Sequence, residues 1–312
     1  MKTLLRIGTR ASLLAITQST WVKNQIESAH PQVRVDLVKI TTTGDRIQDV
    51  PLAKVGGKGL FVKEIEEALL AGEVDLAVHS MKDVPAELPE GLHIGIVPIR
   101  ETAQDAFISV KFPSLEALPQ GATIGTSSLR RKSQLAALRP DLQIVDLRGN
   151  IDTRLRKLDE GLFDAIILAG AGLNRLGMGS RITALLEPEQ MLPAVSQGSL
   201  GIELRTDDTE LLAGMQFLHD PQTAITVAAE RAFLIRLEGG CQVPIAAHAT
   251  LSGATVKLTG LIASVNGREI IKDTVTGPVE QADTLGTTLA ERLLARGGKA
   301  ILDAVYCADA SK

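Results

Sequence analysis

The sequence predicts an α/β fold of two similar lobes, followed by a third domain of the α+β class. Three observations support this prediction. Short segments recur in the same order within the first two thirds of the 312 residues. In that part, apolar strands alternate with amphipathic helices, which is the pattern of a parallel sheet covered on both faces. From Pro221 onward the pattern changes to one helix, three short strands and a second helix.

The recurring segments indicate that each lobe is built as strand, helix, strand, helix, strand. The pairs are RIGTRAS (6–12) with TIGTSSL (123–129), VRVDLVKI (33–40) with LQIVDLRG (142–149), and AGEVDLAVHS (71–80) with EGLFDAIILAG (160–170). Gly72 and Gly161 are expected to end the helix that precedes the third of these strands in each lobe. The alternative is a chance similarity of short segments that contain glycine.

The third domain is expected to carry an antiparallel sheet. A helix is predicted over 222–237, and hairpin turns at Ser252–Gly253 and Asn266–Gly267 separate three strands within 246–275. A last helix within 281–298 ends at two glycines.

Composition limits the function. The net charge of −4 and the 3% aromatic content weigh against a nucleic-acid protein held by bulk charge or by base stacking, but they leave room for a local basic cleft. The chain has two cysteines, Cys241 and Cys307, and two cysteines at distant positions make neither a disulfide framework nor a C-x-x-C metal site. The N-terminus lacks the apolar region of a signal peptide, and no run approaches about 18 apolar residues. We therefore expect a cytoplasmic protein with no metal, no nucleic-acid partner and no membrane span.

Parallel sheets of this kind bind ligands beyond the carboxyl ends of their strands. Functional residues are therefore expected at Thr9–Ser12, His79–Asp83, Thr126–Arg131, Arg148–Arg154 and Ala169–Arg175, and two facing lobes would form a cleft there.

Arginines are frequent at these predicted strand ends. The guanidinium group offers a planar fork of donors that suits carboxylate or phosphate, and free N–H groups at the predicted helix start after Thr126 favour an anion as well. The sequence thus predicts a local anion cleft, although any single arginine could be a solvated surface charge. The six are Arg10, Arg130, Arg131, Arg148, Arg154 and Arg175.

Asp83 follows Lys82 just past an apolar strand. A lone carboxylate among arginines stays ionised, and it could stabilise a cation that forms on a substrate and exchange protons with it. The plain alternative is an exposed ion pair in a loop. His79 is a weaker candidate for a base, because a histidine at a strand end more often packs or donates a hydrogen bond.

Two glycine-rich stretches raise further candidates. Lys54 and Lys58 lie in LAKVGGKGLF (52–61), which does not match a P-loop and predicts either a mobile loop over the cleft or a plain flexible loop. Cys241 follows two glycines and precedes Pro244. It could be a buried structural cysteine, a thiol that turns over, or a thiol that stays attached to a group. A cysteine hydrolase would need a paired histidine, and His248 is a weak candidate for that role.

Six stretches carry a resemblance. They are HSMKDVP (79–85), GTSSLRR (125–131), LRGNIDTRL (147–155), LAGAGLNRLG (168–177), PAVSQGSLGIE (193–203) and LEGGCQVPIA (237–246). Together, and in this order, they resemble the hydroxymethylbilane synthases, also called the porphobilinogen deaminase family, over about residues 5–305.

The resemblance implies a three-domain α/β protein whose first two domains are similar to periplasmic-binding-protein lobes. It implies boundaries of 1–98 plus 199–216 for the first lobe, 104–192 for the second, and 221–312 for an α+β domain that anchors the cofactor. It also implies that VSQGSLGIELR (195–205) returns as a strand to the first lobe.

The implied activity is a transferase reaction of tetrapyrrole and heme biosynthesis. Four porphobilinogen molecules are joined head to tail, ammonia leaves each time, and water releases hydroxymethylbilane. The implied cofactor is a dipyrromethane held by a thioether to Cys241, so that this thiol is an anchor. Asp83 matches the catalytic aspartate, and a monomer is expected.

The resemblance also distributes the remaining residues by motif position. It assigns Lys82, Ser12, Thr126, Ser127, Ser128, Arg130, Arg131 and Gly170 to the cofactor, Arg10, Arg148, Arg154, Arg175 and Gln18 to the substrate, and Lys54, Lys58 and Phe61 to a mobile loop.

Two positions depart from the family pattern. Leu13 stands where the family often has proline, and Ser196 stands where glycine is common. Both concern backbone detail near the cleft and not its charges. The alternative function is a non-catalytic two-lobed module that binds anions, which would need neither Cys241 in a glycine loop nor Asp83 among cations.

Overall fold

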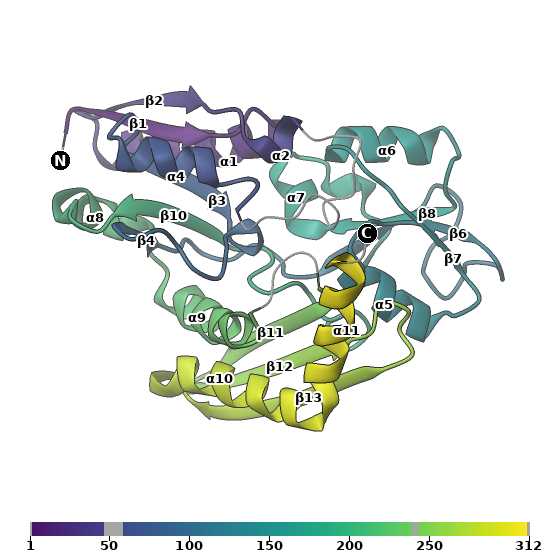
Figure 1. The fold of residues 1–312 in the computed structure, drawn as a ribbon. Helices are drawn as coiled ribbons and strands as arrows, with labels where there is room; N and C mark the ends of the chain where they lie inside the picture. Colours follow the sequence, from purple (N-terminus) through teal and green to yellow (C-terminus); the bar gives the residue numbers. More distant parts are fainter. Residues whose placement is uncertain (1, 47–58, 239–242, 311–312) are drawn as a thin grey trace. The chain divides into compact units, whose positions relative to one another are not determined.

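The computed structural model describes residues 2–46, 59–238 and 243–310, and the chain forms two compact units (Figure 1). Of the described residues, 2–46, 59–101 and 199–224 belong to the first unit, and 102–198, 225–238 and 243–310 belong to the second. Within the described ranges, no helix is both long and apolar enough to cross a bilayer.

The first unit is the first predicted lobe, a five-stranded sheet in the order β2-β1-β3-β10-β4. Its strands are β1 (Leu4–Thr9), β2 (Arg34–Lys39), β3 (Leu76–Ser80), β4 (Leu92–Ile96) and β10 (Leu200–Arg205). Its helices are α1 (Leu13–Ala29), α2 (Thr43–Arg46), α4 (Lys63–Leu70), α8 (Thr209–Met215) and the 3-10 turns η1 (Met81–Asp83) and η3 (Gln216–Leu218).

The second lobe repeats this topology with the order β7-β6-β8-β5-β9. Its strands are β5 (Asp105–Ile108), β6 (Thr123–Gly125), β7 (Gln143–Val145), β8 (Ala165–Ala169) and β9 (Ala184–Leu186). Its helices are α5 (Leu129–Leu138), α6 (Ile151–Asp159), α7 (Gly170–Arg175) and the 3-10 turn η2 (Gly179–Arg181). The shared order confirms that the recurring segments reflect two copies of one architecture.

The prediction of purely parallel sheets was wrong in one respect. β10 runs antiparallel to β3 and β4, and β5 runs antiparallel to β8 and β9. Each is the strand by which the chain enters a sheet after leaving the other lobe, so it starts at the edge where the parallel strands end. The return of 200–205 to the first lobe as β10 is confirmed.

Helix boundaries follow local sequence signals. Ser12 and Ser128 cap α1 and α5, since each hydroxyl accepts a hydrogen bond from the backbone N–H three residues later. Gly72 and Gly161 adopt φ of +70° and +76° just after α4 and α6, as predicted. Leu13 is the first residue of α1 and is 53% exposed, at a position where proline is equally suited to the backbone.

The third sheet joins β11 (Ile245–Ser252), β12 (Thr255–Ala263) and β13 (Ile270–Pro278) in antiparallel order, as predicted. The helices are α9 (Pro221–Arg236), α10 (Ala282–Leu293) and α11 (Lys299–Ala310), with η4 (Val279–Gln281) before α10 and a π-helical turn, η5 (Leu294–Gly298), after it. The predicted end of the last helix at glycine is right for α10, but α11 was missed. Gly297, with φ of +105°, turns the chain so that a further helix follows.

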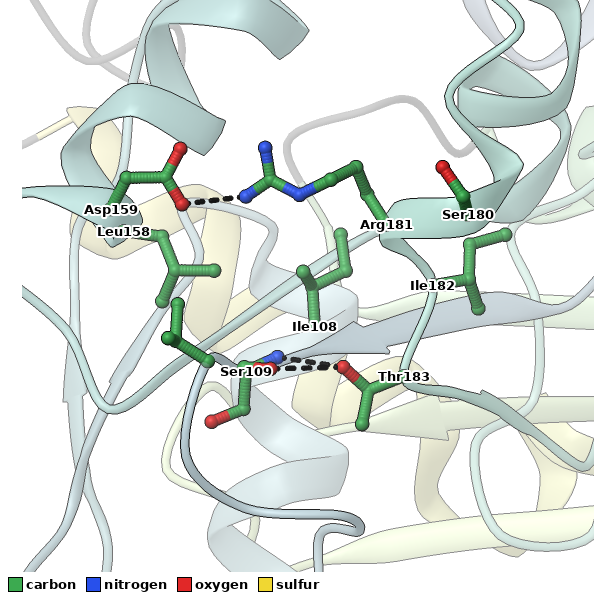
Figure 2. Close-up of a pocket in the computed structure, with 9 residues that line it drawn as sticks. Ile108, Ser109, Leu158, Asp159, Ser180, Arg181, Ile182 and Thr183 are labelled. Atoms are coloured by element: carbon green, nitrogen blue, oxygen red, sulfur yellow. Dashed lines mark hydrogen bonds and ion pairs between the residues drawn. The ribbon is translucent and has the colours of Figure 1, made fainter.

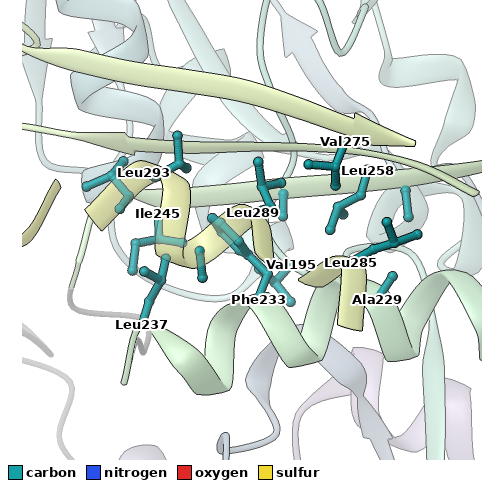
Figure 3. Close-up of a cluster of buried hydrophobic side chains, with 14 of the residues drawn as sticks. Val195, Ala229, Phe233, Leu237, Ile245, Leu258, Val275, Leu285, Leu289 and Leu293 are labelled. Atoms are coloured by element: carbon teal, nitrogen blue, oxygen red, sulfur yellow. The ribbon is translucent and has the colours of Figure 1, made fainter. Parts of the chain in front are cut away.

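The core of the third domain is aliphatic except for Phe233, which is fully buried (Figure 3). Ala229 and Phe233 of α9 pack with Leu285 and Leu289 of α10 in one cluster. The turn between β12 and β13 lies against α5 of the second lobe, where a Cβ atom on Gly267 would be 2.3 Å from the carbonyl oxygen of Ser133. The division into three domains with the boundaries given above stays a prediction.

Candidate functional site

Five predicted site residues of the first lobe line a single cavity of about 60 Å³ at the carboxyl ends of β1 and β3. His79 and Ser80, at the end of β3, complete its polar wall. The structure therefore places these predicted residues together, just beyond the parallel strands of this lobe. The five are Arg10, Ser12, Gln18, Phe61 and Asp83.

Arg10 is held by two neighbours within the cavity wall. Its Nε donates to Oδ1 of Asp45 at 3.1 Å, its second nitrogen bonds the same carboxylate at 2.5 Å, and its guanidinium lies 4.2 Å from the centre of the Phe61 ring. Burial opposes ionisation of Asp45, but Arg10 and the hydrogen bonds from Thr42 together lower the pKa of that carboxyl. An anion that binds Arg10 must therefore share it with Asp45.

The Lys82–Asp83 turn is fixed to the strand beneath it. The backbone N–H of Met81 donates to the carbonyl of Ser199 at 3.0 Å, and the N–H of Val84 closes the 3-10 turn onto Met81. The Met81 side chain is buried against Gly201, where a Cβ atom would lie only 2.2 Å from its sulfur. Gly201 therefore lets the turn sit close to β10 and aims the residues after β3 at the cavity.

Gln18 and His79 both serve as hydrogen-bonding residues. Gln18 is buried, and its Nε2 donates to Oγ of Ser80 at 3.0 Å, which ties α1 to the end of β3. Nε2 of His79 lies 2.8 Å from Oε2 of Glu203, and both side chains are buried. This contact engages one ring nitrogen of His79 and fixes the orientation of the imidazole.

In the second lobe, two predicted arginines converge on one carboxylate. Asp105 is fully buried, and both of its oxygens accept from Arg130, at 2.7 and 3.2 Å, while Arg131 donates to Oδ1 at 2.7 and 3.1 Å. Gln197 Nε2 adds a bond of 3.0 Å to the same oxygen. Burial alone would raise the pKa of Asp105, but the two guanidinium groups hold it well below its usual value.

Within the described part of the chain, Asp105 is the carboxylate bonded to this arginine pair, so two positive charges meet one negative charge. Both guanidinium groups also donate to backbone carbonyls, Arg130 to Leu192 and Arg131 to Ile167. The positive excess is buried, so an anion at this edge of the sheet would restore the balance. The chemistry of the donors therefore fits a ligand with carboxylates.

The hydroxyl residues before α5 are ordered by hydrogen bonds to backbone groups. Ser127 donates from Oγ to the carbonyl of Leu147 at 3.0 Å, Ser128 caps the helix, and the Thr126 hydroxyl accepts from the N–H of Ser128 at 3.3 Å. All three follow β6 directly, as predicted.

The other predicted residues of the second lobe also lie just beyond strands. Arg154 donates to the carbonyl of Gly149 at 2.7 Å, and Arg175 donates to the carbonyl of Gly198 at 2.6 Å. The Arg148 carbonyl accepts from Lys157 at 3.2 Å. Gly170 begins α7 in a tight space, where a Cβ atom would lie 3.0 Å from the Thr102 side chain and 3.2 Å from the carbonyl of Gln104. Packing alone thus accounts for the glycine at 170.

Three predicted residues, Lys54, Lys58 and Cys241, lie outside the described residues. Cys307 lies in α11, but its side chain is also outside the description. Among the side chains that are described, no cluster of three or more His, Cys, Asp or Glu residues could hold a metal ion.

A larger hollow lies at the other end of the strands of the second sheet, beyond the end of β5 at Ile108 (Figure 2). Arg181 bonds Asp159 at 2.6 Å there, and the Thr183 hydroxyl bonds the backbone of Ser109. It contains none of the predicted site residues.

Sequence reasoning missed the acidic partners of the arginines. Asp45 lies within α2 and Asp105 begins β5, and each pairs with an arginine distant in the sequence. An aspartate at the start of an apolar strand, as in DAFI (105–108), is a signal that could have found the second one, because a buried carboxylate requires a partner.

Two family models match most of the chain. Residues 5–213 match the family model described as porphobilinogen deaminase, dipyromethane cofactor binding domain, and 224–295 match the porphobilinogen deaminase C-terminal domain.

Full-length relatives extend the match. The chain is 59% identical to the porphobilinogen deaminase of Trichlorobacter lovleyi over 97% of this chain and 96% of that one, and 58% identical to that of Geobacter metallireducens over 97% and 95%. Among solved structures, it is similar to the methionine-binding protein MetQ, at 14% identity and a TM-score of 0.45 over 75% of this chain and 95% of that one. The chain belongs to the porphobilinogen deaminase family.

Proposed function

We propose that this protein joins four porphobilinogen units head to tail, releasing ammonia at each step, to give hydroxymethylbilane. The observation that carries the proposal is the cavity of the first lobe, where one carboxylate, Asp83, shares a wall with Arg10 and Ser12. A carboxylate in such a cavity is suited to a reaction that forms a positive pyrrole methylene when ammonia leaves.

Acidic and basic residues have different roles in this reaction. Asp83 stabilises the positive ring and exchanges a proton with it, while Arg10 orients the acetate and propionate groups of the arriving unit. Arg148, Arg154 and Arg175 follow strands of the second lobe and take further carboxylates of the lengthening product. Each added pyrrole brings two more anionic groups, which is why so many guanidinium groups serve one reaction.

The cofactor implied by the family is a dipyrromethane, which supplies the primer to which units are added. The excess positive charge at Asp105, Arg130 and Arg131 fits its carboxylates, and the hydroxyl groups of Ser127 and Ser128 lie at the same strand end. We assign its covalent attachment to Cys241 through a thioether. A monomer, a cytoplasmic location and the absence of nucleic-acid and membrane partners remain predictions.

Intact-protein mass spectrometry tests the anchor. Active protein should exceed the sequence mass by one dipyrrole, and brief exposure to porphobilinogen should add stepwise increments of one pyrrole unit. Cys241→Ser should carry no stable addition, with Cys307→Ser as the matched control that keeps it. Active protein with the bare sequence mass, or normal turnover by the Cys241→Ser variant, would contradict the assignment.

A further inference from the structure

Three ionisable side chains that the reaction above does not use are buried behind the cavity of the first lobe. His79, Glu203 and Glu66 are 6%, 1% and 6% exposed. His79 lines the cavity together with Asp83. The group is therefore in contact with the site and at the same time withdrawn from solvent.

Sheet register brings His79 and Glu203 together, and the helix that covers them carries Glu66. β3 and β10 are antiparallel, with His79 opposite Gly201 and Ala77 opposite Glu203, so His79 and Glu203 share one face of the sheet. α4 covers that face, since its Ile65 and Leu69 pack with Ala77, and it carries Glu66. The 2.8 Å contact from His79 Nε2 to Glu203 Oε2 is the outcome.

The hydrogen bonding of this group is incomplete. Among the described residues, Oε1 of Glu203 and Oε1 of Glu66 are both buried without a hydrogen-bond partner. His79 contacts Glu203, and Glu66 is a second buried carboxylate on the helix that covers them. Two buried carboxylates beside a single imidazole leave net negative charge away from solvent, which is costly. A further proton on the carboxylates removes that charge, so the group has a place for an exchangeable proton.

We propose that Glu66, Glu203 and His79 form a buried proton store for the Asp83 cavity. The inference rests on the proposed function. In each condensation one ring C–H bond breaks, its electron pair returns to the aromatic ring, and the proton leaves. The store accepts that proton at Glu66 by way of His79, which Glu203 positions, and then gives it to the released ammonia, which departs as ammonium.

The electrostatics place this exchange near neutral pH. The pKa of Glu66 is raised to about 7, mainly by burial and next by the negative charge of Glu203. His79 lowers this pKa, and Glu67 on the same helix raises it slightly. On the cavity side the charged groups are Arg10 and Asp83. Glu66 is thus ionised and able to accept a proton above about pH 7, and it is filled below that pH.

The test is the pH dependence of kcat for the cofactor-loaded protein between about pH 5.5 and pH 9. Wild type should show kcat rising through an apparent pKa near 7. Glu66→Gln should lose this rise, with kcat near the wild-type value at low pH and about tenfold lower at pH 8. Glu73→Gln, an exposed carboxylate of the same lobe, should keep the wild-type profile.

A second variant keeps the test independent of folding at position 66. Glu203→Gln retains an acceptor for His79 but removes the charge that raises the pKa of Glu66, so the rise in kcat should move to lower pH. The proposal of a proton store would be overturned if either folded variant showed the rise in kcat at the same pH as wild type. It would also be overturned if kcat of the wild-type protein did not rise near pH 7. Absence of hydroxymethylbilane from wild type at every pH would overturn the proposed function, and the store with it.

Discussion

The two lobes share one topology but use their strand ends differently. In the first, Arg10 and Asp83 line a cavity, and Arg10 is 22% exposed and bound to the partly exposed Asp45. In the second, Arg130 and Arg131 are buried around Asp105, which is fully enclosed. A charged group that is paired near solvent can exchange its partner with little loss of free energy. A buried pair cannot, because separating it would leave an uncompensated charge in the interior. On the function proposed above, this difference suits the Asp83 cavity of the first lobe to the chemical step, and the Asp105 pair of the second lobe to holding the cofactor.

Asp83→Asn is the change with the largest expected effect, and it tests the first half of this comparison. The amide keeps the size of the side chain but neither balances a positive ring nor takes a proton. We expect the rate of hydroxymethylbilane formation to fall roughly 10²–10⁴-fold, with the dipyrromethane mass addition and the unfolding midpoint unchanged.

The control for Asp83→Asn is Glu87→Gln, which removes a nearby carboxylate outside the cavity lining. It should leave the rate as in wild type. A wild-type rate in Asp83→Asn would move the chemistry away from the first lobe, and a loss of cofactor in that variant would erase the difference between the lobes.

Asp105→Asn tests the second half. It leaves two buried guanidinium groups without their carboxylate, and we expect a loss of about 3–5 kcal/mol in the free energy of unfolding, measured by urea denaturation. Folded protein should also be recovered with less dipyrromethane by intact mass, because the arginines that we assign to the cofactor lose their orientation.

Asp159→Asn is the matched control for Asp105, since it breaks a surface pair with Arg181 in the same lobe. Its effect on unfolding should be much smaller, and its cofactor content should be normal. Equal stability losses in the two variants would mean that the burial of Asp105 does not set its importance.

The sequence-based predictions were accurate where the signal is local. The helix start after Thr126, the glycines after α4 and α6, and the hairpin turn at Ser252–Gly253 depend on hydrogen bonds within a few residues, and each was predicted. Placement of Arg10 and Asp83 at strand ends followed because the strands themselves were apparent from apolar runs.

Features that depend on distant partners were missed. The direction of β5 and β10 is decided by where the chain enters each sheet, and the pairing of Arg130 with Asp105 joins residues 25 positions apart. The contact of His79 with Glu203 spans 124 positions. Periodicity carries no information on such contacts, so the anionic partners of the predicted cations could be identified only in three dimensions.

Ser196 offers the smallest expected effect, at the segment that leaves the second lobe toward β10. Its φ of +58° lies in the left-handed region, and its buried hydroxyl has no hydrogen-bond partner among the described residues. Its backbone N–H donates to Glu230 at 2.5 Å, a bond that any residue can make. Ser196→Gly removes the strain of a left-handed backbone at a residue with a Cβ atom, and it removes the buried hydroxyl. Glycine also makes the unfolded chain more flexible, which offsets part of this gain. We expect a net gain of about 0.5–1 kcal/mol in the free energy of unfolding.

Ser196→Ala separates the two contributions, because alanine removes the hydroxyl but keeps the Cβ atom and its strain. Its gain should be smaller than that of Ser196→Gly, and urea denaturation of both variants measures the difference. If alanine stabilises the protein as much as glycine does, the buried hydroxyl accounts for the entire loss of stability at position 196, and the backbone there is unstrained. If glycine destabilises, the serine is favoured at this position, and the departure from the family's usual glycine strengthens the connection between the lobes.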